Sequence, residues 1–339
     1  MSTTMKLQET QTGTWNRVKN AVARRTEGRA VILLILVVGV IAVQQPIVFN
    51  AYGVSLARVA LVGLVALGLT LVVLQGELDL SVGSTLALTG VVVASIPDLG
   101  LGIIAGLVTG VAIGALNAFL IVVIGVNSFI ATLGTLFALR GLAFVMSDGR
   151  PVRITDIDSA LVFGRELLGP ITPRVLIFIL LFVMLQFFIS KMRAGREFYA
   201  VGGNRQAAID AGIPVKLRLF TSFMLCGFVA ALAGVINTLE LTAADPTAGS
   251  TVLLASFAAV IIGGNLLNGG RGSLVGTLIG AFALGLMQVG LTFAGADREV
   301  QDVLIGIVLL VAITTDPNNL RALSRRLQGL IRGKANQQA

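Results

Sequence analysis

Glu77 and Asp79 form a closely spaced acidic pair beside the start of an apolar run. Two carboxylates could act as general acid and base, or could line a transport path or its gate. They could equally stabilise the helix that follows. Asp79 and Ser81 stand at capping positions, and acids favour the positive end of a helix. The pair leaves catalysis, transport and capping open.

Most other catalytic chemistry is excluded by composition. The chain has no histidine, and its one cysteine, Cys226, lies inside an apolar run. A histidine-based triad, a histidine zinc site, a cysteine cluster and a disulfide framework therefore cannot form. The phosphate-binding pattern Gly-x-x-x-x-Gly-Lys-Ser/Thr is also missing. We expect no catalytic residue, no metal and no cofactor, and any ATP must be bound by a partner subunit.

The composition indicates a membrane protein. Hydrophobic residues make up 55% of the 339 residues and charged residues only 12%, with a mean hydropathy of +0.93. Soluble proteins carry about 25% charged residues. Forty glycines suit closely packed transmembrane helices. We therefore predict an all-α polytopic protein in the bacterial plasma (inner) membrane.

Ten apolar runs are predicted to cross the bilayer. Two of them, 82–97 and 251–264, are short for a membrane span, and each adjoins a glycine-rich polar break. Short, interrupted spans at related places in two halves point to a repeat around a central path. Helices 2–5 and 7–10 are expected to form an inverted repeat. The runs are 30–49, 53–74, 82–97, 101–123, 127–146, 174–190, 218–239, 251–264, 272–294 and 300–315.

The positive charges predict the topology. Most of the 25 Lys and Arg residues lie in three segments that flank apolar runs, as in cytoplasmic loops. Both termini should then be cytoplasmic, and the net charge of +8 requires no nucleic-acid partner. The expected parts are a basic tail 1–29, a transmembrane domain 30–315 with an external loop 147–173 and a cytoplasmic loop 191–217, and a basic tail 316–339.

The cytoplasmic loop is the natural surface for a soluble partner. Asn204 is a candidate helix N-cap, Ala207 and Ala208 favour helix, and Gly212 followed by Pro214 would end it. A short capped helix between two spans could carry force from a motor, although an ordinary connector would look similar.

Charges inside the apolar runs are few. Arg58 and Arg140 either extend to the membrane surface or face a cavity or partner. No acid lies centrally in a predicted span, which argues against ion coupling.

Six stretches resemble the membrane subunits of bacterial ABC importers for monosaccharides of the ribose, galactose and xylose type. The resemblance extends from about residue 50 to 316. It is carried by 76–84, 126–135, 195–204, 207–213, 244–249 and 263–272.

The resemblance implies several partners. They are a cytoplasmic ATPase, often with two fused cassettes, an external solute-binding protein, and a second permease that is an identical copy or a paralogue. It assigns ATPase coupling to Gly202, Gly203, Asn204, Ala207, Ala208 and Gly212. It assigns the path or its gates to Asn127, Ser128, Phe129, Asp245, Pro246 and Thr247, and Glu77 and Asp79 are added as candidates from their position. Glu77 departs from the apolar residue expected there.

The leading hypothesis is the permease subunit of an ATP-driven importer for a monosaccharide or sugar-like solute. One alternative is an ion-coupled secondary carrier for a small polar solute. Another is a membrane enzyme that acts on a lipid-linked sugar through Glu77 and Asp79.

Overall fold

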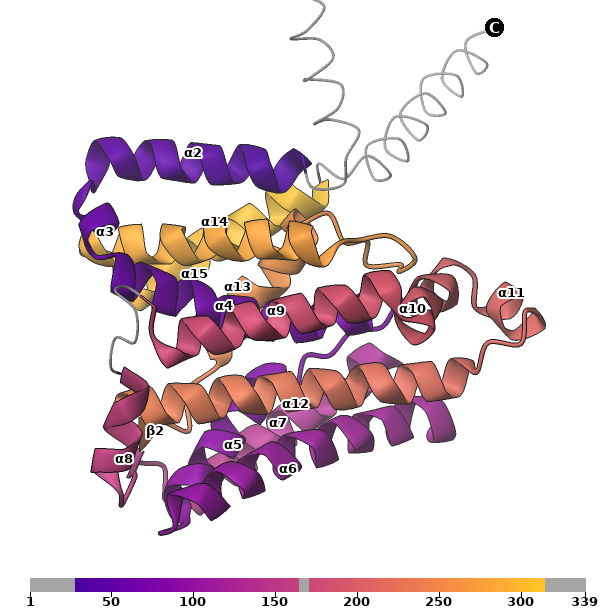
Figure 1. Cartoon of the computed structure of the whole chain (residues 1–339), viewed down its shortest axis with the longest axis horizontal. Coiled ribbons are helices and arrows are strands. Elements are labelled where there is room, and N and C mark those ends of the chain that lie inside the picture. The colour runs from indigo at the N-terminus through magenta and orange to yellow at the C-terminus, as the bar shows by residue number, and fades with distance from the viewer. Residues whose placement is uncertain (1–27, 165–170, 315–339) are drawn as a thin grey trace, which may run out of the picture.

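A computed structural model describes residues 28–164 and 171–314, which are mostly helical (Figure 1). Six helices within these described residues are long and apolar enough to cross a membrane, so the chain is a mostly helical, polytopic membrane protein. The elements are α2 (Gly28–Gln44), α3 (Ile47–Asn50), α4 (Tyr52–Val73), α5 (Val82–Ser95), α6 (Leu99–Phe119) continued by the π-turn η1 (Leu120–Ile124), α7 (Ser128–Met146), β1 (Val152–Arg153), α8 (Ile157–Leu161), η2 (Val162–Gly164), α9 (Pro173–Lys191), α10 (Arg193–Gly203), α11 (Arg205–Asp210), α12 (Val215–Leu241), β2 (Ala243–Ala244), α13 (Ser250–Ile262), α14 (Leu274–Phe293) and α15 (Arg298–Thr314).

The six long helices are α4, α6 with η1, α7, α9, α12 and α14. The other predicted runs hold shorter helices. These are α2 with 17 residues, α5 with 14, α13 with 13 and α15 with 17. The run 30–49 is not one helix, because Pro46 has no amide hydrogen and disfavours a helical conformation at Gln45. A count of ten crossings therefore remains a prediction.

The loops contain more structure than the sequence indicated. The loop 147–173 holds β1, which pairs antiparallel with β2 so that Val152 lies opposite Ala244. The loop 191–217 holds two helices, α10 and α11, rather than one. The predicted tails lie outside the described residues, apart from residues 28 and 29.

The core is built around α4 and α12, which pack on each other. The packing of the two halves matches when α4, α5, α6 and α7 are paired with α12, α13, α14 and α15. The helix α4 packs on α14, and α12 packs on α6. Within the halves, α5 packs on α6 and α7, and α13 packs on α14 and α15. Small residues allow this closeness. A Cβ on Gly114 of α6 would overlap the backbone of Phe223 in α12.

The bundle has two distinct ends (Figure 1). We call the end with α10 and α11 the α11 end and the end with α8, β1 and β2 the β2 end. The first residues of α2 and the last residues of α15 lie towards the α11 end.

Candidate functional site

Three chain segments cross within backbone contact at the α11 end, and we call this the glycine junction (residues 74–76, 202–203 and 268–270). The amide of Gly270 donates to the carbonyl of Leu74 at 2.9 Å. A Cβ on Gly202 would overlap that carbonyl oxygen, and a Cβ on Gly269 would lie 2.5 Å from the amide nitrogen of Gly76. The end of α10 is therefore packed directly on the end of α4 and on the α13–α14 loop.

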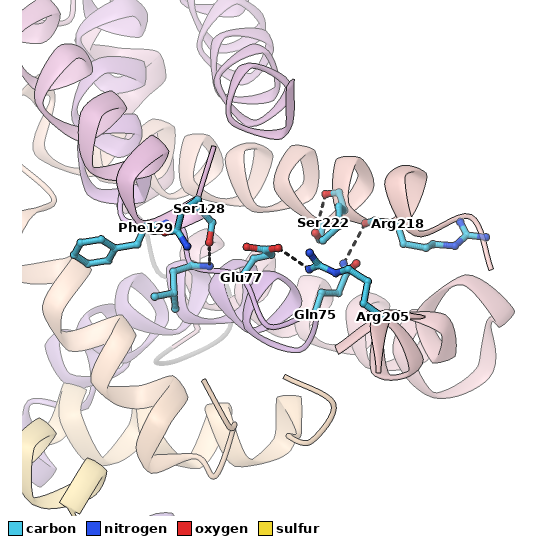
Figure 2. A network of polar contacts seen from close by, with 10 residues as sticks. Gln75, Glu77, Ser128, Phe129, Arg205, Arg218 and Ser222 are labelled. Carbon is cyan, nitrogen blue, oxygen red and sulfur yellow. Dashed lines mark hydrogen bonds and ion pairs between the residues drawn. The ribbon is translucent and has the colours of Figure 1, made fainter. Parts of the chain in front are cut away.

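An ion pair adds to this connection. Arg205, the first residue of α11, donates from Nη2 to Oε1 of Glu77 at 2.6 Å (Figure 2). Glu77 is buried and Arg205 is exposed. Gln75 also donates to the carbonyl of Arg218 at the start of α12. The unexpected acid at position 77 thus has a physical role, because it holds the loop 191–217 to the segment before α5.

The loop also has its own ion-pair network. Glu197 of α10 accepts from Arg193 at 2.8 Å and from Arg218 at 2.6 Å. Burial would raise the pKa of Glu197, but hydrogen bonds and charge from Arg218 and Arg193 outweigh it and lower the pKa below its ordinary value. Glu197 is therefore a carboxylate near neutral pH, and it fixes α10 against α12.

The six predicted coupling residues have different environments. Asn204 caps α11 as expected, because its Oδ1 accepts from the amide of Ala207 at 3.0 Å. Gly212 ends α11 with φ +75°. Gly203 and Ala207 are exposed, whereas Ala208 is 3% exposed and belongs to a cluster with Val201, Val215 and Leu219. Ala208 thus packs α11 against α10 and α12.

The ion pair between Glu77 and Arg205 makes a direct prediction. Neutralising either residue by glutamine should lower coupled uptake by about two- to fivefold, as expected for a partly exposed pair. The reversed pair Glu77→Arg with Arg205→Glu should recover part of that loss. Arg196→Gln is a matched control, because this α10 guanidinium contacts only a carbonyl, that of Lys191, among the described residues. Equal losses in single and reversed variants would exclude a pairwise role.

A buried polar cluster lies beside this segment, and we define it as Asp79, Ser81, Asn117 and Thr135. Asp79 accepts from the amide and the hydroxyl of Ser81 at 2.9 and 2.6 Å. Asn117 of α6 donates to Ser81 Oγ at 2.8 Å and accepts from Thr135 of α7 at 2.9 Å. All four residues are buried. Ser81 stands at the N-cap of α5 as expected, but its side chain makes no cap bond to the helix, because its hydroxyl is used in this cluster. Asp79 accepts from the Ser81 amide at this end of the helix.

The start of α7 contacts the same segment. The Ser128 hydroxyl accepts from the amide of Leu78 at 3.3 Å, and Thr132 donates to the Leu78 carbonyl. Asn127 caps α7 through the amide of Phe129, and the Phe129 ring points away from Glu77 (Figure 2). The structure therefore brings Glu77, Ser128 and the cluster together, but not the Phe129 side chain.

The β2 end contains a cavity of 460 Å³. Its lining includes Asp245, predicted from the sequence, and Arg58, which donates to Gln288 at 2.8 Å. Arg298 lines it too and donates to Thr251 at 2.9 Å. The volume lies in the range of small-molecule sites, about 300–1,000 Å³. The cavity can hold a small polar solute.

Arginines fix the segment beside this cavity. Arg140 of α7 donates to the carbonyls of Pro246 and Ala248 at 2.7 and 2.9 Å. Arg58 faces the cavity. Of the two hypotheses for Arg58 and Arg140, the structure supports contact with a cavity or with protein groups rather than extension to the membrane surface.

One sequence motif occurs twice and was missed by sequence reasoning. Residues 79–84 read Asp-Leu-Ser-Val-Gly-Ser, and residues 245–250 read Asp-Pro-Thr-Ala-Gly-Ser. Asp245 accepts from the amide and hydroxyl of Thr247, as Asp79 does from Ser81. The two motifs also touch each other. A Cβ on Gly83 would lie 2.7 Å from the carbonyl oxygen of Gly249, and a Cβ on Gly249 would overlap the carbonyl oxygen of Gly83. An internal alignment of the two polar breaks would have revealed this.

The protein thus combines a multi-helix membrane domain, a cavity of mixed polar and apolar lining at one end and a packed helical loop at the other. The chain belongs to the family described as the branched-chain amino acid transport system / permease component, whose profile matches residues 52–313. It is therefore an integral membrane transport subunit, not an enzyme.

Three curated relatives are similar over most of their length. The ribose import permease of Escherichia coli is 37% identical over 301 residues, covering 86% of this chain and 93% of the relative. The ribose import permease of Bacillus subtilis is 40% identical over 266 residues, covering 77% and 83%. A probable ABC transporter permease of Sinorhizobium fredii is 36% identical over 300 residues, covering 87% and 90%. No solved structure matches the chain.

Proposed function

We propose that this chain is the permease subunit of an ATP-driven importer for a monosaccharide or sugar-like solute. The observation that carries the proposal is the glycine junction with the pair Glu77–Arg205, which connects the loop 191–217 to the segment before α5. A force applied to α11 by a motor would reach the transmembrane helices through these contacts. Gly203 and Ala207, both exposed on this loop, would face the ATPase.

The proposal includes a topology. Ten crossings would place both termini and the loop 191–217 in the cytoplasm. The first residues of α2 and the last residues of α15 both lie towards the α11 end, which supports this (Figure 1). Helices 2–5 and 7–10 would form an inverted repeat. The matched packing of α4 to α7 and α12 to α15, together with the repeated motif, supports that arrangement.

The proposal also includes partners. A cytoplasmic ATPase, possibly with two cassettes in one chain, would bind the loop 191–217. A solute-binding protein outside the membrane would deliver the solute to the β2 end. A second permease, either an identical copy or a paralogue, would complete the path.

The solute class is inferred from the relatives and the cavity. Two relatives are ribose import permeases. The side chains of Arg58, Gln288 and Asp245 offer hydrogen-bond donors and acceptors to a hydroxylated solute. The family description names branched-chain amino acids, so the two solute classes must be compared directly.

The test is uptake by the reconstituted system. Proteoliposomes that contain this chain are supplied with an ATPase and a binding protein of the ribose-importer class from the same organism, and uptake of labelled ribose, other monosaccharides and leucine is measured. We expect a monosaccharide to accumulate only when ATP and both partners are present, with no effect of dissipating ion gradients. Uptake of leucine alone would reject the solute class. Ion-driven accumulation without the ATPase would favour the secondary carrier.

A further inference from the structure

The two copies of the repeated motif have the same local geometry and opposite exposure. In both, the aspartate accepts from the backbone amide and hydroxyl of the residue two positions later. Asp245 lines the cavity and Thr247 is exposed. Asp79 and Ser81 are each only 1% exposed. One motif is thus at an open site and the other is enclosed.

The surroundings of the two motifs also correspond. The lining of the cavity includes the start of α13, the end of α14 and the start of α15, together with residues of α4, α5 and α12. The buried cluster contains the segment before α5, Asn117 near the end of α6 and Thr135 of α7. These are the matching elements of the two halves, and Gly83 and Gly249 touch between them.

We infer that Asp79, Ser81, Asn117 and Thr135 form a second solute site, which opens towards the α11 end when the cavity at Asp245 closes. The inference rests on the proposed transport function. The ligand class is a neutral, polyhydroxylated molecule. Carboxylate, amide and hydroxyl groups can each bond to a solute hydroxyl, and no Lys or Arg forms an ion pair with Asp79 among the described residues.

The enclosed state explains why these polar groups bond to one another. A buried polar group without a partner is costly, and polar groups within a membrane domain mark functional positions. In the closed state the four side chains satisfy each other in a continuous series. Once the site opens, the same donors and acceptors become available to a solute.

The connection to the loop provides a route for opening. Glu77 contacts Arg205 of α11, and the next residue, Leu78, contacts Ser128 and Thr132 of α7. Asp79 follows immediately. A displacement of α11 would therefore move the segment that closes the cluster.

Cysteine accessibility tests the inference with a matched pair. Ser81→Cys and Thr247→Cys occupy the same motif position. Both are made in a Cys226→Ala background, because the thiol of Cys226, the one cysteine of the chain, contacts Asp79 and would border the opened site. Each variant is assembled with its ATPase and binding protein in nanodiscs and labelled with a hydrophilic maleimide. Labelling is measured without nucleotide and with ATP bound to a hydrolysis-deficient ATPase.

We expect labelling at the two positions to change in opposite directions between the two states, by about tenfold or more, because a minor open state is populated at roughly 10% or less. The transported sugar should slow labelling of Ser81→Cys. Thr135→Cys is a second reporter in case Ser81→Cys does not assemble.

The inference is overturned if neither buried position is labelled in any state, provided that the parent complex transports sugar. That result would leave the proposed function intact. Simultaneous labelling at both ends would overturn it too. Loss of transport by the parent complex itself would instead reject the proposed function.

Discussion

Replacing Gly202 by valine is expected to abolish ATP-driven uptake, with a loss of about tenfold or more, because overpacking of a close contact costs about 1–3 kcal/mol or more. A Cβ at this position would overlap the Leu74 carbonyl oxygen and lie 2.5 Å from the Gly270 amide nitrogen. Both neighbours are backbone atoms and cannot rotate away. The measurement is uptake together with ATPase activity in the reconstituted complex, and we expect ATP hydrolysis to persist without solute transport.

The neighbouring glycine provides the matched control. A Cβ on Gly203 would meet no atom within 4 Å, so Gly203→Ala should leave the fold and uptake close to normal. Gly203→Glu adds charge to the exposed surface and should weaken binding of the ATPase without disturbing the glycine junction. Equal uptake by Gly202→Val and the parent chain would show that the three segments need not stay in contact.

Replacing Gly249 by alanine is expected to destabilise the folded protein strongly. Gly249 has φ +86°, and an added Cβ would overlap the backbone of Gly83. The left-handed conformation costs a residue with a side chain about 1–2 kcal/mol, and the overlap adds about 1–3 kcal/mol. The measurement is the thermal unfolding midpoint of the purified protein in detergent, followed by fluorescence or loss of the monodisperse peak.

A substitution at Gly125 measures the cost of the left-handed backbone conformation without the steric overlap. It has the same φ of +86° between α6 and α7, but a Cβ there would meet no atom within 4 Å. Gly125→Ala should therefore show the conformational cost alone and a much smaller shift of the midpoint. Similar shifts in the two variants would mean that the contact between Gly83 and Gly249 contributes little.

The sequence predicted the helices well because apolar runs and polar breaks follow directly from the membrane environment. The short spans at 82–97 and 251–264 correspond to α5 and α13, which have 14 and 13 residues. Asn204 was a correct cap because its signal is local. The split at Pro46 is also a local signal, but the residues around it are apolar, and hydrophobicity alone predicts one continuous run over 30–49.

Local sequence patterns do not indicate which residues far apart in the chain make contact. Nothing local indicates that Glu77 contacts Arg205, or that Asn117 bonds to Ser81 rather than facing lipid. The repeated motif can be recognised in the sequence. Its two copies share the Asp, the Ser or Thr, the Gly and the final Ser, and yet one copy is buried and the other lies at the cavity. Exposure depends on how α6, α7, α14 and α15 pack around each copy, which no single motif encodes.

The pair Glu77–Arg205 joins residues 128 positions apart in the chain. Consider a chimera that receives the segment 191–217 from a relative in which the residue at position 77 is apolar. If the donor loop carries no basic residue at position 205, the buried carboxylate of Glu77 loses its cation. Exchanging the loop to accept a foreign ATPase thus requires residue 77 to be exchanged with it, so compatibility between permease and motor is set in part by a residue that no motor would touch.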